Sequence, residues 1–204
     1  MAIGLLRGSV CIVLTQRDLV SGRPTGYNSL VDKRDAALDA SFWINAHRAS
    51  LVEFLPDYFN LRAPTAVIEE IEYLLPGVVQ LTPAGESLRQ WRQAGRLEIQ
   101  DPTQAVDWFD RGENAAIALA REQGYVLLID DQAPYHLAKA RGLKTIGATD
   151  FVVLVYADRR LSYDDALSVL ASLGTAEHLK RAAMTAVGLL ARQRSERDGN
   201  DTGQ

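Results

Sequence analysis

The sequence predicts an α/β protein with a central, mainly parallel sheet that helices cover on both faces. Short apolar or β-branched runs alternate along the chain with longer segments that carry helical periodicity or helix caps. A parallel strand pair needs a long crossover connection, usually a helix, so this alternation is typical of a parallel sheet. The 204 residues, 47% of them apolar, suffice for one well-buried domain.

Strands are expected wherever a short apolar run stops at a turn or helix-start residue. The first is a run of small residues that ends on Asp39, and Pro64 ends the second. The fourth, VLLI, stops at the pair Asp130–Asp131. The expected strands cover residues 36–39, 59–63, 97–99, 125–129 and 144–146.

Helices are expected between and after these strands. Ser41 and Thr65 are suitable N-caps, and Gly142 stands where a C′ glycine ends a helix. Pro56 is expected to break the first helix, and Pro76–Gly77 the second. The expected helices cover residues 42–54, 65–75, 86–93, 101–109, 113 to the fourth strand, 134–141, 149–156, 162–174 and 175–192.

The alternating elements are predicted to form one domain over residues 35–150. Residues 1–34 are interpreted as an N-terminal extension in which Ser9–Thr15 is a candidate edge strand. Residues 151–204 are interpreted as a C-terminal helical extension, with a polar, frayed tail from Ser195.

Composition excludes several functional classes. The net charge of −4 gives no general attraction to nucleic acid, so such binding needs a local basic patch or metal ions. Cys11 is the single cysteine, which excludes an internal disulfide and fits a reducing cytoplasm. No apolar run is long enough to span a bilayer, and Arg7 interrupts the apolar start, which argues against a signal peptide. We therefore expect a cytoplasmic protein.

Acidic residues stand at positions where a parallel sheet places its sites. Asp39 and Asp130–Asp131 follow predicted strands, and the carboxyl ends of parallel strands share one edge. Glu113 begins a helix, and Glu70 borders the apolar stripe of the helix 65–75. Carboxylates gathered without Lys or Arg repel one another and favour a divalent cation, and oxygen ligands suit Mg²⁺ or Mn²⁺. Such an ion can bind a phosphodiester and lower the pKa of a water.

Each acidic residue also has a local explanation. Asp39 can cap the following turn, Glu113 suits a helix N-terminus, and Asp130–Asp131 suits a turn. A Glu such as Glu70 is most often a solvated helix residue. The functional interpretation therefore depends on these positions occurring together.

The sequence contains few signals for other kinds of catalytic or phosphate-binding site. The three histidines are isolated, Ser41 lacks the glycines of a nucleophile elbow, and no glycine-rich phosphate loop is present. Lys139 and Arg141, with Arg48, are candidate phosphate contacts, although scattered cations are usually a solvated face. The three tryptophans are expected in or beside the core.

Four segments together resemble the PIN domain family, and they extend over about residues 35–150. They are LDASFWIN (38–45), VIEEI (67–71), GENAAIALA (112–120) and LLIDDQAPYHLAKARGLKTIG (127–147). The resemblance is closest to members with a GExxAI motif followed by IDD. It implies a three-layer α/β/α sandwich and a Mg²⁺- or Mn²⁺-dependent ribonuclease, commonly the toxin of a toxin–antitoxin pair, with RNA as substrate and an antitoxin as possible partner.

The resemblance also implies roles for individual residues. By position, Asp39, Glu70, Glu113 and Asp131 match the acidic quartet, and Asp130 is the alternative fourth member. Asp39, Glu113 and Asp131 would hold one ion, and Glu70 would complete the site directly or through water. Ser41 matches a small hydroxyl position, and Asn45 a position that is often polar; both are candidate substrate contacts.

The chain departs from the usual pattern of the family in two respects, and two other functions stay open as alternatives to the ribonuclease. The 34 residues ahead of the first strand and the long tail after Asp150 could cover the acidic edge, bind a partner or mediate a homodimer. A phosphatase of the haloacid dehalogenase type also has a strand ending in DD, but it requires DxD at the first strand, and here position 41 is Ser. A PIN-like module that binds RNA or protein without cleavage is the other alternative.

Overall fold

A computed structural model of the chain describes residues 33–72 and 81–201, with side chains described up to residue 196. The candidate edge strand Ser9–Thr15 and the expected helix stop Pro76–Gly77 lie outside these residues. Among the described helices, none is both long and apolar enough to cross a membrane.

The described residues contain a five-stranded sheet in which every pairing is parallel. Small and branched apolar residues dominate its centre, where Ala36 pairs with Leu61 on one side and Val126 on the other. The predicted α/β fold is thereby confirmed. The strands are β1 (Arg34–Leu38), β2 (Phe59–Ala63), β3 (Leu97–Ile99), β4 (Val126–Leu128) and β5 (Thr145–Ile146), in the spatial order β3-β2-β1-β4-β5.

This strand order reverses beside the first strand. The chain proceeds outward from β1 through β2 to β3, then returns and places β4 on the other side of β1. In open parallel sheets, a crevice forms at the carboxyl edge where the order reverses, and ligands bind there. The ends of β1 and β4 are therefore the expected location of a site.

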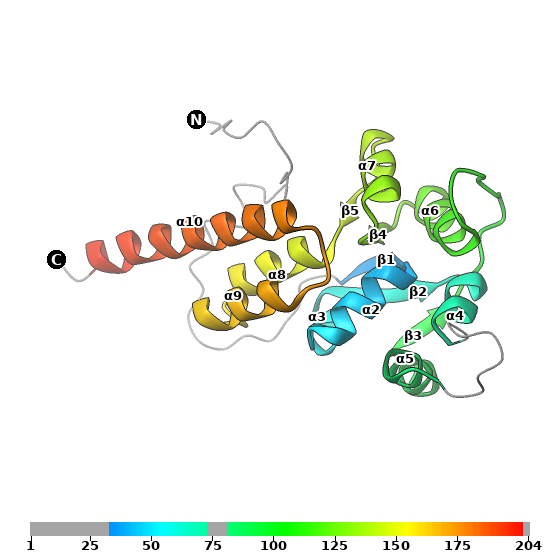
Figure 1. The fold of residues 1–204 in the computed structure, drawn as a ribbon, viewed down its shortest axis with the longest axis horizontal. Coiled ribbons are helices and arrows are strands. Elements are labelled where there is room, and N and C mark those ends of the chain that lie inside the picture. Colours follow the sequence, from blue (N-terminus) through cyan, green and yellow to red (C-terminus); the bar gives the residue numbers. More distant parts are fainter. Residues whose placement is uncertain (1–32, 73–80, 202–204) are drawn as a thin grey trace.

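Helices cover both faces of the sheet. Figure 1 shows α2 to α5 around β1, β2 and β3, α6 and α7 around β4 and β5, and α8, α9 and α10 as a group to the left. The helices are α2 (Ala40–Arg48), η1 (Val52–Phe54), α3 (Leu55–Tyr58), α4 (Thr65–Glu72), α5 (Pro83–Gln93), α6 (Arg111–Gln123), α7 (Gln132–Ala140), α8 (Ala148–Ala157), α9 (Tyr163–Ser172) and α10 (Glu177–Asp201).

Aromatic side chains fix the layers against one another. The indole of Trp43 on α2 donates a 2.9 Å hydrogen bond to the carbonyl of Ala84 and meets the ring of Trp91 edge-on at 5.3 Å. Phe151 of α8 packs on Tyr58, with ring centroids 5.4 Å apart. Trp43 and Trp91 are thus core residues, as expected, while Trp108 is half-buried.

The predicted helix over 101–109 is wrong, because side chains satisfy the backbone of this loop instead. The backbone N–H of Thr103 donates to the carboxylate of Glu122 at 2.8 Å, while the carboxylate of Asp101 accepts from the backbone N–H and hydroxyl of Thr65 at 2.7 and 2.8 Å. The side chain of Asn114 accepts from the N–H groups of Trp108 and Phe109, both at 2.9 Å. Such local bonds compete with helix formation.

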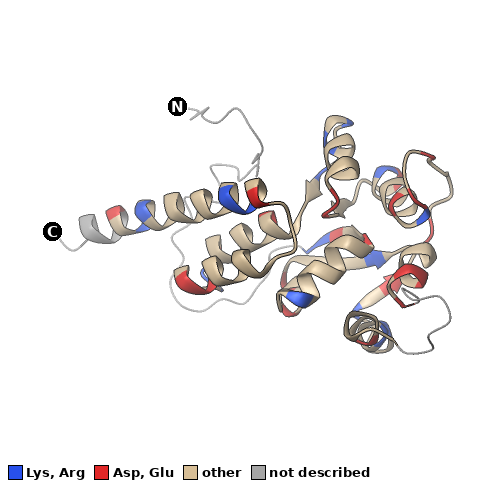
Figure 2. Cartoon of the chain, in the orientation of Figure 1, with Lys and Arg blue, Asp and Glu red and all other residues tan. Residues whose placement is uncertain are grey.

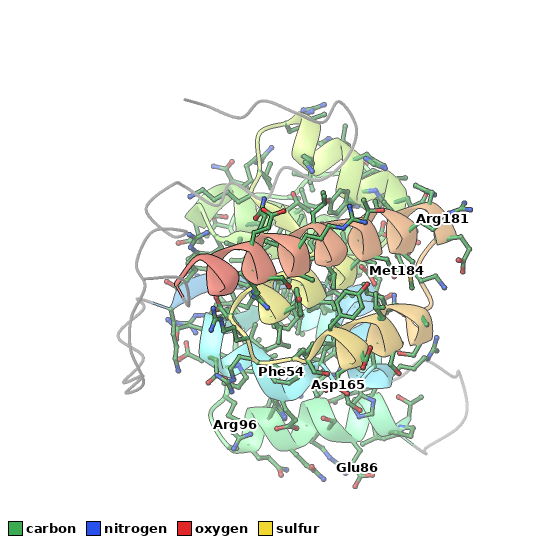
Figure 3. The ribbon with its side chains drawn as sticks, turned by 90° about the vertical axis from the view of Figure 1, so that its left-hand side faces the viewer. Phe54, Glu86, Arg96, Asp165, Arg181 and Met184 are labelled. Carbon is green, nitrogen blue, oxygen red and sulfur yellow. The ribbon has the colours of Figure 1, made fainter. Side chains whose placement is uncertain are left out.

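Two other helix predictions need correction. The expected helix 42–54 ends at Arg48, because Ser50 adopts a positive φ of 57°, and Pro56 lies in the first turn of α3 instead of ending a helix. The expected frayed tail is wrong up to Asp201, where α10 ends. Arg194 anchors the helix by donating to the carbonyls of Tyr156 and Ala157, both at 2.8 Å. Figure 3 shows α10 lying over α8 and α9, with Met184 on the side that faces them.

Candidate active site

Asp39 lies at the carboxyl end of β1 and is the N-cap of α2. Its backbone N–H donates to the carbonyl of Leu128 on β4 at 3.0 Å, which holds it at the point where the strand order reverses. Its Oδ2 accepts hydrogen bonds from the backbone N–H and hydroxyl of Ser41, at 2.9 and 2.5 Å. The residue is 1% exposed, and its Oδ1 is buried without a hydrogen-bond partner.

Ser41 joins the ends of the two central strands. Its hydroxyl donates to Asp39 and accepts from the backbone N–H groups of Asp130, at 3.0 Å, and Asp131, at 3.3 Å. The proton and the acceptor capacity of the hydroxyl are thus already engaged. This arrangement indicates that Ser41 positions the acidic residues; its suggested contact with a substrate stays a prediction.

The long loop after β3 brings Glu113 to the same edge. It carries the chain from the sheet margin back to α6, where Asp110 is the N-cap and its backbone N–H donates a long 3.4 Å hydrogen bond to Glu113. Burial, the largest cause, and the neighbouring carboxyl of Asp131 together raise the pKa of Glu113 to about 7, against the effect of that hydrogen bond. Glu113 and Asp131 are therefore close neighbours.

Glu70 reaches the cluster from α4. Its carboxylate rests against the backbone of Gly112, so closely that a Cβ at position 112 would collide with Glu70 Oε2. Partial burial raises the pKa of Glu70, and the charges of Asp110 and Asp131 raise it further. Figure 2 shows acidic residues on α4 and on the segment that leads into α6.

Asp110 was not predicted from the sequence as a residue of the site. It influences both Glu70 and Glu113 and is thus a fifth acidic member of the group. The signal was available, because Asp110 precedes Glu113 by three residues, as an N-cap precedes its N3 acid. Because a helix was predicted over residues 101–109, the capping role of Asp110 at the start of the next helix was not predicted. We call Asp39, Glu70, Asp110, Glu113 and Asp131 the acidic cluster.

The carboxylate of Asp130, next to cluster member Asp131, is fully hydrogen-bonded to groups outside the acidic cluster. One oxygen accepts from the N–H of Ala148 at 2.7 Å, and the other from the amide of Asn45 at 2.6 Å and the hydroxyl of Thr175 at 3.2 Å. The residue is 9% exposed, and burial raises its pKa. Asp130 and Asn45 thus fasten α2, α8 and the start of the C-terminal helices to the end of β4.

The two candidate phosphate contacts on α7 are engaged elsewhere. Lys139 Nζ donates to the hydroxyl of Tyr135 at 3.3 Å, and that hydroxyl donates to Asp150 at 2.9 Å. Arg141 lies over the indole of Trp108, with its Cζ 4.5 Å from the ring centroid. In the described structure, neither cation forms an ion pair with the acidic cluster.

The cluster concentrates negative charge in a partly dry place. Burial, the largest cause, and the charges of Glu70 and Glu113 together raise the pKa of Asp39 to about 7, against the opposing effect of the Ser41 hydrogen bonds. No Lys or Arg within residues 33–72 and 81–196 forms an ion pair with any cluster member. Nor, over the same residues, do three Asp, Glu, His or Cys side chains converge closely enough to hold one ion.

The buried, unpaired Oδ1 of Asp39 nevertheless fits a cation. A buried carboxylate oxygen without a partner is costly, and the surrounding donors are carboxylates, the ligands that Mg²⁺ and Mn²⁺ prefer. Glu70 and Asp131 are exposed, so the core does not confine their side chains.

Comparison with known proteins agrees with this geometry. The PIN domain family matches residues 36–185, which include the sheet, α8, α9 and part of α10. No curated protein and no solved structure matches the chain. Members of this family are generally nucleases and typically use divalent metal ions. Because the match covers most of the chain, the protein belongs to the PIN domain family and has its nuclease-type fold.

Proposed function

We propose that this protein is a Mg²⁺- or Mn²⁺-dependent endoribonuclease that hydrolyses phosphodiester bonds in RNA, and that it is the toxin of a type II toxin–antitoxin pair. The observation that carries the catalytic part is the buried, unpartnered Oδ1 of Asp39 among carboxylates that lack a cationic partner. The toxin part extends from the family resemblance and implies an antitoxin protein as partner. Growth arrest by the wild-type protein but not by a catalytic variant would test it.

In this proposal the acidic cluster holds the ion, and the substrate phosphate would bind at the cluster through that ion. Asp39, Glu113 and Asp131 would ligate the ion, and Glu70 would complete the set directly or through water. When bound, such an ion supplies a water of lowered pKa and stabilises charge on the leaving oxygen. Ser41 orients Asp39 and Asp131, and the engagement of both Asp130 oxygens favours Asp131 as the ligand.

The Asp39→Asn variant tests the catalytic proposal. It keeps an oxygen for the two Ser41 hydrogen bonds but removes the charge that would bind the ion. We expect RNA cleavage in Mn²⁺ to fall by about 10²- to 10³-fold, as for loss of a major electrostatic contribution to catalysis. Asp35→Asn, at the other end of β1, is the control and should cleave normally. Equal cleavage by wild type and Asp39→Asn would reject the assignment.

The Gly112→Ala variant tests the placement of Glu70. Its Cβ would displace the Glu70 carboxylate, and a displacement of about 1 Å can reduce activity by about 10²-fold. In a Glu70→Ala background, the same change should cost little more. Gly188→Ala on α10 is the matched control, because a Cβ there meets nothing within 4 Å. Additive losses in the double variant would contradict the role given to Gly112.

A non-catalytic PIN-like module is the second candidate. It is favoured by the lack, among the described side chains, of three ligands already close enough for one ion. Titration calorimetry with Mn²⁺ separates the two. Binding that Asp39→Asn abolishes supports the nuclease, whereas a folded wild-type protein that binds no Mn²⁺ supports the module.

A further inference from the structure

Two arginines converge on the half-buried indole of Trp108. Arg121 Cζ lies 5.7 Å and Arg141 Cζ 4.5 Å from the ring centroid. Arg121 is in the last turn of α6, and Arg141 is the C-cap of α7. We call Trp108, Arg121 and Arg141 the Trp108 patch.

The patch is held firmly in place. The side chain of Asn114 accepts from the N–H of Trp108 and donates to the carbonyl of Phe109 at 2.5 Å. The indole also packs against the core. The ring is therefore an ordered platform, so little conformational entropy is lost when a ligand stacks on it.

Helix electrostatics explain the arginines only in part. A cation near a helix C-terminus is stabilised by the helix dipole, and either arginine would gain this without touching Trp108. Both arginines are exposed, and in the described part of the chain neither forms an ion pair. A chain of net charge −4 thus presents two uncompensated guanidinium groups on one aromatic ring.

This combination matches the chemistry of a single nucleic-acid strand. Guanidinium groups donate in their plane to phosphate oxygens, and bases of any sequence stack on aromatic faces and on guanidinium planes such as that of Arg141, which lies over the indole. The patch is linked to the acidic cluster at two distances: Trp108 precedes Asp110 by two residues, at most about 7 Å of chain, and Arg121 follows Glu113 by eight residues, about 12 Å along α6.

We propose that the Trp108 patch binds a single-stranded segment of RNA that flanks the phosphodiester at the acidic cluster. The identity of the strand as RNA depends on the proposed function. An acidic protein segment would also pair with the arginines but would make no use of the indole face, so the patch favours a nucleic-acid strand.

The test separates binding from cleavage. A labelled single-stranded oligouridylate is titrated with Asp39→Asn protein in EDTA, so that no strand is cut. Adding Arg121→Gln and Arg141→Gln should weaken binding by at least tenfold and reduce the salt slope by about 1.4, or about 0.7 for each lost phosphate contact on a single strand. Arg89→Gln, which removes one exposed charge from α5, is the control and should change binding little.

Tryptophan fluorescence tests the stacking separately. Of the three tryptophans, Trp43 is fully buried and Trp91 is 5% exposed, so quenching by RNA should report Trp108. The proposal predicts quenching that is absent in Trp108→Phe. Unchanged RNA affinity in the double arginine variant would overturn the proposal, as would equal competition by polyglutamate. If arginine variants bind RNA weakly but wild type never cleaves it, the patch stands and the catalytic proposal fails.

Discussion

Replacing Asp39 by Asn is expected to make the metal-free protein more stable at pH 8, although it removes activity. Burial raises the pKa of Asp39 from 3.8 to about 7, so the folded chain holds this proton more tightly than the unfolded chain. Stability is therefore greatest below about pH 4, falls as the pH rises toward 7 and stays low above it. Asn removes a cost of up to about 4 kcal/mol.

Thermal unfolding in EDTA from pH 4 to pH 8 measures this effect. The midpoint of wild type should fall across the range, and that of Asp39→Asn should fall less. Asp35→Asn is the control, because its side chain is 41% exposed and lies at the opposite end of β1. Parallel pH profiles of the unfolding midpoint for wild type and Asp39→Asn would show that the buried Asp39 carboxylate does not destabilise the fold.

The adjacent residues Asp130 and Asp131 should give opposite results on substitution. Asp130→Ala leaves three donors without their acceptor, from Ala148, Asn45 and Thr175. Each buried unsatisfied group costs about 1–3 kcal/mol, so we expect a loss of about 3 kcal/mol. For a chain of this size, that lowers the unfolding midpoint by roughly 6–12 °C.

Asp131→Ala is the matched comparison. This carboxylate is exposed and makes no capping hydrogen bond to α7, and its removal relieves repulsion with Glu113. We expect near-normal stability and a loss of RNA cleavage. Denaturant unfolding and a cleavage assay on both variants decide the matter. A stable Asp130→Ala, or an active Asp131→Ala, would contradict these assignments.

The strands of the sheet could be predicted because each of them has a local sequence signal. β2 and β3 are apolar or alternating runs between turn signals, and their ranges were predicted without error. The loop 100–110 could not be predicted in the same way. Its conformation depends on Thr65 and Asn114, which meet it only in the folded chain, and local patterns carry no information about such contacts.

The acidic cluster was predictable in membership but not in geometry. The predicted strand ends identified Asp39 and the pair Asp130–Asp131 as site candidates. Two successive Asp residues do not show which of them belongs to the acidic cluster and which is buried among other partners. The deciding partners of Asp130 are distant in sequence, as Thr175 lies 45 positions away. Asp110 was predictable from helix-capping rules.

The hydrogen bond from Thr175 to Asp130 connects the segment between α9 and α10 to the end of β4. A protein that binds α9 or α10 and moves Thr175 would also displace the end of β4, which is followed by Asp131. Inhibition from a distance would then need no blockage of the substrate path, only a slight shift of the Asp131 carboxylate.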